Sequence, residues 1–70
     1  MFWLFERGGQ FLRLEVLPLA SNQFELRVIR ADGSETTEVF SNASDLAKRQ
    51  AQFHDQARSE GWSGPRGPLV

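Results

Sequence analysis

The 70-residue sequence contains no cysteine, no tyrosine and a single histidine. Without cysteine the chain has neither a disulfide framework nor a thiolate metal site, the two devices that stabilise many domains of this size. One histidine is too few for a zinc site built from several imidazoles. The fold must therefore rest on local backbone chemistry, a small apolar core and contacts between chains.

Long apolar runs and an excess of one charge are also missing, although the chain opens on the apolar stretch MFWLF. That run stops at Glu6, whereas a secretory signal needs an apolar region of about 7 to 15 residues and a membrane helix about 20. We therefore expect a cytoplasmic protein without a membrane segment. The net charge of -1 provides no general attraction to nucleic acid or anionic lipid.

What the sequence does contain is a series of β-branched and aromatic stretches, which predict strands at 2–6, 11–17, 23–30 and 35–40. The pair Gly8-Gly9 suits a two-residue hairpin turn, because glycine tolerates positive φ angles. That turn places Phe5 opposite Leu12 on the face that becomes the core. The connection over residues 18–22 is looser and leaves its register open.

The strongest turn signal is Asp32-Gly33, which predicts a second hairpin with a two-residue turn. Its register would form two charge pairs, Arg30 with Glu35 and Arg27 with Glu38. It would also direct Val39 toward the core. A three-residue turn with a bulge would shift the register by one residue and direct Phe40 inward instead.

One helix is predicted over residues 43–60, which contain neither glycine nor proline. Asn42 can cap its start, and Asp45 places a negative charge in the first turn. Gly61 suits a left-handed C-terminal cap, and Trp62 follows where an apolar residue can pack back onto the last turn. A narrow stripe on one helix face consists of Leu46, Gln50, Phe53 and Ala57.

These elements predict an α+β fold in the order ββββα, a four-stranded antiparallel meander with a C-terminal helix packed on one face. Residues 1–62 would form a single domain, and residues 63–70 a flexible Gly/Pro-rich tail. The predicted core consists of Trp3, Phe5, Leu12, Leu14, Val16, Phe24, Leu26, Val28, Val39, Leu46, Phe53 and Trp62.

A single helix covers only one face of a sheet, so the opposite face should remain open. Five side chains expected there form the predicted partner interface: Phe2, Leu4, Phe11, Arg13 and Ile29. The strand at 2–6 also carries no lysine or proline to discourage pairing at its edge. We expect a homodimer, or a complex with another protein, through this strand and the outer face. The alternative is that the N-terminus folds back over the aromatic rings, or that long arginine side chains lie over them.

Candidates for catalysis are few. His54 lies on the flank of the helix stripe beside Asp55 and one turn before Arg58, and we interpret it as a partly exposed helix histidine, because a general base needs a cleft and a tuning neighbour. Residues 7–10 lack the glycine spacing of a phosphate-binding loop. We therefore predict no enzymatic activity, no catalytic, metal-binding or cofactor-binding residues, and no cofactor.

The resulting functional hypothesis is a small non-enzymatic protein-interaction module with an adaptor or regulatory role. The alternative is a nucleic-acid-binding module that uses the arginines expected on the outer face: Arg7, Arg13, Arg27 and Arg30. Five glutamates are expected among them: Glu6, Glu15, Glu25, Glu35 and Glu38. Because phosphate contacts dominate nucleic-acid affinity and interleaved carboxylates oppose them, the protein partner is the favoured hypothesis.

The run LRVIRADGSETTEVFSNASDLAKRQAQFHDQARSEGW, from Leu26 to Trp62, resembles small strand-rich bacterial proteins of uncharacterised function. In these proteins a strand, a DG turn, a second strand ending in Phe and a helix ending in Gly-Trp follow in order. The resemblance implies a small stand-alone cytoplasmic protein, and it carries over no catalytic residue.

Overall fold

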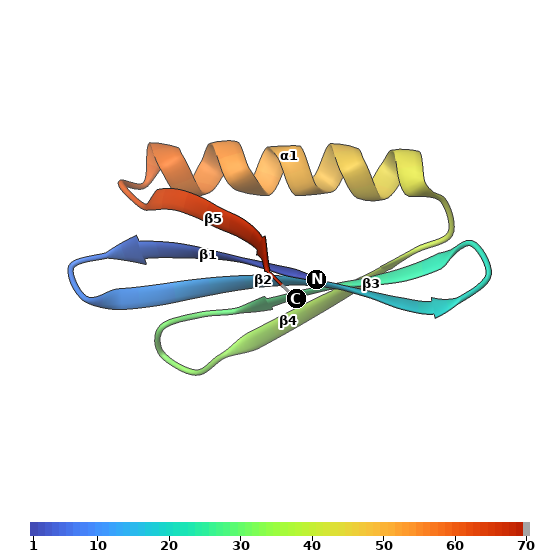
Figure 1. Cartoon of the computed structure of the whole chain (residues 1–70), viewed down its shortest axis with the longest axis horizontal. Coiled ribbons are helices and arrows are strands. Elements are labelled where there is room, and N and C mark those ends of the chain that lie inside the picture. The colour runs from blue at the N-terminus through green and yellow to red at the C-terminus, as the bar shows by residue number, and fades with distance from the viewer. Residues whose placement is uncertain (70) are drawn as a thin grey trace.

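The computed structural model describes residues 1–69, which form one five-stranded antiparallel sheet and one helix (Figure 1). The elements are β1 (Phe2–Arg7), β2 (Gln10–Ala20), β3 (Gln23–Ile29), β4 (Glu35–Phe40), α1 (Ala43–Ser59) and β5 (Ser63–Leu69). Their order in the sheet is β4-β3-β2-β1-β5. The predicted α+β class is confirmed, whereas the predicted order ββββα is incomplete, because α1 lies between β4 and a fifth strand.

The first hairpin has the predicted register, with Phe5 opposite Leu12. The predicted loop at 18–22 is mostly strand, because β2 continues to Ala20 and only two residues make the turn. Asn22 adopts a positive φ of 62°, a conformation that asparagine tolerates better than most residues. The long β2 therefore pairs with β1 on one side and β3 on the other along most of its length.

The turn between β3 and β4 differs from the prediction, because it contains the three residues 31–33. The amide of Arg30 donates to the carbonyl of Ser34 at 2.8 Å, which closes the loop. Gly33 has a φ of 89°, and the amide of Ser34 donates to the Asp32 carboxylate at 2.9 Å. This is the common three-residue hairpin, in which glycine occupies the left-handed position.

The longer turn shifts the register of β4 by one residue. The two predicted charge pairs, Arg30 with Glu35 and Arg27 with Glu38, are therefore wrong. Glu38 lies opposite Leu26 on the helix side of the sheet. Val39, predicted to be in the core, points outward and is 61% exposed, while Phe40 packs against the core in its place.

The helix begins and ends as predicted to within one residue. The side chain of Asn42 accepts a hydrogen bond from a first-turn amide at 2.8 Å. At the other end the amide of Trp62 donates to the carbonyl of Ala57, and the amide of Gly61 donates to that of Arg58, both at 3.0 Å. These two bonds define a Schellman motif, which holds the buried Trp62 side chain under the last turn.

The segment predicted to be a flexible tail forms β5 instead, and it pairs antiparallel with β1. Ser63 lies opposite Glu6 and its hydroxyl donates to the Glu6 carbonyl at 2.9 Å. Two register shifts interrupt the pairing and accommodate the Gly-Pro pairs. A Cβ atom on Gly67 would lie 2.8 Å from the carbonyl oxygen of Phe2, so the two backbones meet where there is no side chain. Val70, the last residue of the predicted tail, lies outside the described residues.

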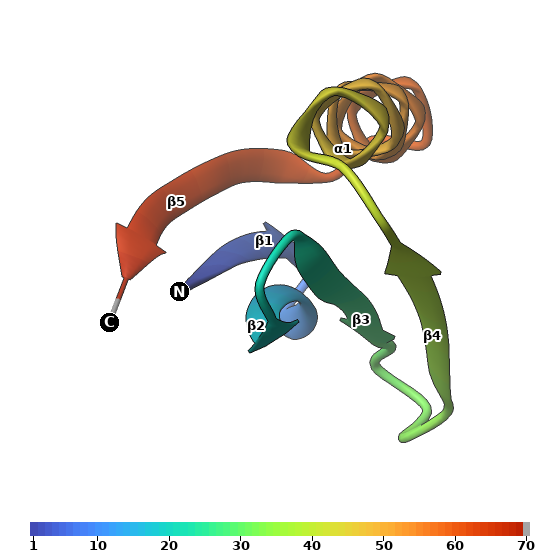
Figure 2. The same cartoon turned by 90° about the vertical axis from the view of Figure 1, so that its right-hand side faces the viewer.

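The core lies between α1 and one face of the sheet. Its buried members are Phe5, Leu12, Leu14, Leu26, Val28, Leu46, Ala57 and Trp62, with Trp3, Val16, Phe24, Phe40 and Phe53 packed around them. The predicted core is thus confirmed except at Val39. Figure 2 shows the strands following an arc, with α1 on one side of it. Within residues 1–69 no helix is long and apolar enough to cross a membrane.

Candidate interaction face

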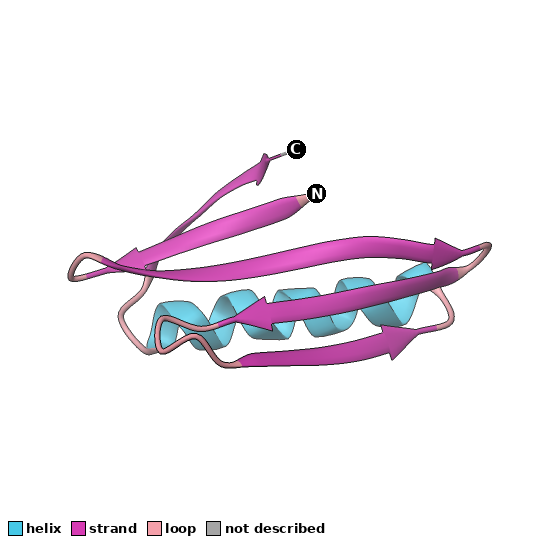
Figure 3. Ribbon diagram, turned by 90° about the horizontal axis from the view of Figure 1, so that it is seen from below, coloured by secondary structure: helices cyan, strands magenta, loops and turns pink. Residues whose placement is uncertain are grey.

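The sheet face opposite α1, here called the outer face, is covered by no other element of the described chain (Figure 3). Strand alternation directs every second side chain toward it. Leu4 lies opposite Arg13, and Arg13 lies opposite Ile29, so these three form one row across β1, β2 and β3. Phe2 and Phe11 occupy other rows of the same face. The structure therefore brings all five predicted interface residues onto one surface.

The apolar residues of the outer face differ in exposure. Phe11 is 52% exposed, and Phe2 is half-buried. Two further residues join the face that sequence analysis did not assign to it. Val39 is there because the β3–β4 turn contains an extra residue, and Leu69, 38% exposed, lies opposite Phe2 because β5 pairs with β1. The outward position of Val39 agrees with the three-residue turn that the sequence left as an alternative. The sequence of the Gly-Pro segment gives no indication that Leu69 lies on this face.

The centre of the outer face carries a connected chain of ion pairs. Arg13 contacts Glu15 at 2.8 Å, and Arg27 contacts Glu25 at 2.8 Å and Glu15 at 3.7 Å. The Glu15 and Glu25 side chains are only 15% and 18% exposed, because neighbouring side chains on the sheet crowd them. Two arginines and two glutamates balance one another, so the centre of the face has no net charge.

Arg13 also lies over an aromatic ring. Its guanidinium carbon is 3.8 Å from the centroid of the Phe2 ring, within cation–π distance. The predicted alternative, in which arginines cover the aromatics, is therefore realised at Phe2. Phe11 remains half exposed at the end of β2 nearest the first turn.

The prediction that β1 is a free edge is wrong. β1 pairs with β2 on one side and β5 on the other, and the edge strands are β4 and β5. Pro65 and Pro68 lack backbone N–H groups, which reduces the pairing capacity of β5. Association by pairing two copies of β1 is excluded in this fold, and the outer face remains as the predicted surface.

The four arginines expected on the outer face are divided between the two sides of the sheet. Arg7 lies on the helix side, where its guanidinium is 4.4 Å from the Trp62 ring centroid. Arg30 is also on that side and donates to the Thr36 hydroxyl at 3.3 Å. Arg13 and Arg27 remain on the outer face, each paired with carboxylates. This distribution does not favour nucleic-acid binding by the outer face, because the arginines on β2 and β3 already have anionic partners.

His54, predicted to be partly exposed, is half-buried against the core. Its ring meets those of Trp3 and Phe5 edge-on, at centroid distances of 6.0 and 5.5 Å. Its Nε2 atom is buried and has no hydrogen-bond partner among the described residues. Burial lowers the pKa of His54, the nearby Arg58 lowers it further, and Asp55 acts in the opposite direction. The neutral ring is therefore a packing element of the core.

No cluster of three His, Asp or Glu side chains within residues 1–69 is arranged to hold a metal ion. Comparison with known proteins gives no relationship: no family, no curated protein and no solved structure matches this chain. Any functional proposal must therefore come from the surfaces of the molecule itself.

Proposed function

We propose that this chain is a small non-enzymatic interaction module, with an adaptor or regulatory role, that forms a homodimer through its outer face. The observation that carries the proposal is a sheet with one uncovered side on which apolar side chains surround the central ion pairs: Phe2, Leu4, Phe11, Ile29 and Val39. Exposed apolar side chains gathered on one open face and bordered by polar residues are typical of protein interaction sites.

A second copy of the chain is the occupant that best fits this face. The central network pairs two arginines with two glutamates, so two copies related by a two-fold axis can bring these centres together without a surplus of like charge there. Arg13, for instance, can exchange its partner Glu15 for the same residue of the second copy. A strongly charged partner would leave part of this network unmatched.

Because the core is small, burial of further apolar side chains in a dimer would add substantially to the stability of the fold. Within residues 1–69 only eight apolar side chains are buried, all between α1 and the sheet. Full burial of a side chain such as Phe11 contributes about 1.5 to 3 kcal/mol, before the entropic cost of association. In a dimer, several such side chains from each copy would form a second apolar layer between the two outer faces.

The test is the molar mass in solution, measured by light scattering over a concentration series. We expect the wild-type chain to approach twice 8.0 kDa as concentration rises. Phe11→Glu removes an exposed apolar group and places a charge on the outer face, so its dimer should weaken by about tenfold or more. Ala51→Glu is the matched control, because it introduces the same charge at an exposed position of α1.

Comparison of the two variants distinguishes a loss of contacts at the outer face from a general effect of added negative charge on association. If the wild-type chain keeps a mass of 8.0 kDa up to near-millimolar concentration, the homodimer is wrong. If a dimer forms and Phe11→Glu weakens it no more than Ala51→Glu does, the interface lies elsewhere.

A further inference from the structure

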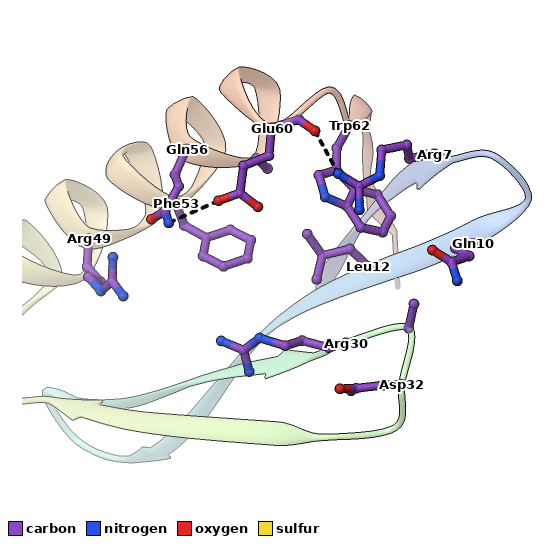
Figure 4. A pocket seen from close by; sticks show the side chains of 12 residues that line it. Arg7, Gln10, Leu12, Arg30, Asp32, Arg49, Phe53, Gln56, Glu60 and Trp62 are labelled. Carbon is purple, nitrogen blue, oxygen red and sulfur yellow. Dashed lines mark hydrogen bonds between the residues drawn. The ribbon is translucent and has the colours of Figure 1, made fainter.

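The helix side of the sheet contains a cleft that the proposed dimer does not use. It has a volume of about 470 Å³ and lies between the C-terminal half of α1 and the turns of the two hairpins (Figure 4). Small-molecule sites typically occupy about 300 to 1,000 Å³. The cleft exists because Trp62 holds the end of α1 beside β1, while the β3–β4 hairpin diverges from the helix (Figure 1).

The wall of the cleft nearest the core is apolar and firmly held. Leu12 and Trp62 are buried, and Phe53 is half-buried with its ring directed toward the cleft in Figure 4. Arg7, which also lines the cleft, holds Trp62 in place, because its guanidinium lies 4.4 Å from the ring centroid and donates to the Glu60 carbonyl at 2.7 Å. The apolar surface is therefore formed before any ligand arrives.

Two other arginines face the cleft, and each is anchored at one point only. The Nε atom of Arg49 donates to both carboxylate oxygens of Glu38, at 3.1 and 3.0 Å. One terminal nitrogen of Arg30 donates to the Thr36 hydroxyl at 3.3 Å. Among the described residues the other N–H groups of these two guanidinium groups have no acceptor. Each arginine is thus oriented by one contact and keeps donors available for an anion.

Two carboxylates line the cleft, and the side chain of each accepts one hydrogen bond from a neighbouring group. Asp32 accepts a hydrogen bond from the Ser34 amide at 2.9 Å within the turn, and Glu60 accepts one from the Gln56 side chain at 3.1 Å. In the view of Figure 4 the guanidinium of Arg30 points toward the Arg49 side of the cleft, away from Asp32. The cleft therefore has an end at which two guanidinium groups keep unused N–H donors, although Glu38 balances the charge of Arg49, and it has an apolar middle.

We propose that this cleft binds a small organic anion, with an apolar planar body against Phe53 and Leu12 and a carboxylate or phosphate held by Arg30 and Arg49. A guanidinium group presents two parallel N–H donors to such an anion, which gives both strength and direction. The apolar wall excludes water from one side of the contact and so strengthens it. The cleft and the outer face lie on opposite sides of the sheet, so this proposal does not depend on the dimer.

The test is a titration of the ¹⁵N-labelled chain followed by two-dimensional NMR, with phenylphosphate and phenylacetate as anionic probes. Saturable shifts should appear at the Arg30 and Arg49 side chains and at the Trp62 indole. The tighter of the two probes identifies the anion class. Benzyl alcohol, which has the ring without the charge, and inorganic phosphate, which has the charge without the ring, should each bind at least about tenfold more weakly.

Arg30→Gln tests the arginine end of the cleft with little risk to the fold, because Arg30 is exposed and makes a single long hydrogen bond. It should weaken the tighter probe by about tenfold. Arg66→Gln is the matched control, since Arg66 is an exposed arginine on β5 outside the cleft, and it should leave the affinity unchanged. The proposal is wrong if neither probe gives saturable shifts, if the shifts map to the outer face, or if both variants bind equally well.

Discussion

At the scale of single residues, arginine–aromatic pairs recur on both sides of the sheet. Arg7 lies over Trp62 on the helix side, and Arg13 lies over Phe2 on the outer face. In each case a long apolar stem and a planar cation cover an aromatic surface that a chain of this size cannot bury completely. This is how a sequence without cysteine extends a small core.

Protonation of His54 should make the stability of the fold depend on pH. Burial between Trp3 and Phe5 lowers its pKa below the ordinary value of 6.5, so the unfolded chain binds the proton more readily than the folded chain. The neutral ring therefore contributes its full stabilisation at pH values above 6.5. This contribution is lost as the pH falls from 6.5 toward the lower pKa of the folded state.

The measurement is urea unfolding about one pH unit above and about one unit below 6.5, for the wild type and for His54→Phe. The wild type should lose more stability at the lower pH than the variant, because phenylalanine keeps an aromatic ring in the core without a titrating group. Equal losses in the two proteins would show that His54 titrates alike in the folded and unfolded chains.

At the scale of secondary-structure elements, β5 forms one edge of the sheet next to β1. It occupies the edge that β1 would otherwise expose. Its close approach to β1 depends on glycine at two positions, Gly64 and Gly67. A Cβ atom on Gly67 would meet the Phe2 carbonyl oxygen at 2.8 Å, and the φ of 126° disfavours any L side chain. The strand can lie there only because those positions carry no side chain.

Gly67→Ala should therefore detach the end of β5. We expect a loss of about 2 to 4 kcal/mol in unfolding free energy, together with faster hydrogen exchange of the β1 amides that face β5. Gly33→Ala is the control, because Gly33 also has a positive φ, 89°, but no atom of the described residues lies within 4 Å of its added Cβ. That variant should lose only about 1 kcal/mol. Equal losses would mean that the contact with β1 does not determine the position of β5.

The elements also show what the sequence can predict. Gly8 and Gly9 fixed the first hairpin correctly, because a two-residue turn allows one register only. Asp32 and Gly33 fit both a two-residue and a three-residue turn, and the choice depends on packing that a local motif does not contain. β5 was missed because glycine and proline are typical of loops, and its pairing with β1 spans most of the chain.

The candidate sites were predictable to different degrees. Strand alternation alone placed Phe2, Phe11 and the rest of the predicted interface on one face. Alternation also places Arg7 on the same side as Phe5, and the structure shows it there, against the prediction that it lies on the outer face. The cleft was not predictable, because it depends on how far the β3–β4 hairpin diverges from α1.

At the scale of the whole molecule, the protein is an elongated two-layer structure, with extents of 38 × 21 × 20 Å. One layer is α1 and the other is the sheet, and the core lies between them. A dimer through the outer faces would place the two sheets together and yield four layers, with the helices outside. That arrangement would leave the cleft of each copy open to solvent, because it lies on the helix side.

The central claim is that two copies meet through their outer faces, and intermolecular NOEs test it most directly. The sample is an equimolar mixture of ¹³C-labelled and unlabelled chains, in which only contacts between copies give filtered signals. We predict signals from the Phe11 ring and the Ile29 and Val39 methyl groups of one copy to the outer face of the other. Filtered signals that arise from α1 instead, or none at a concentration well above that needed for association, would contradict the account.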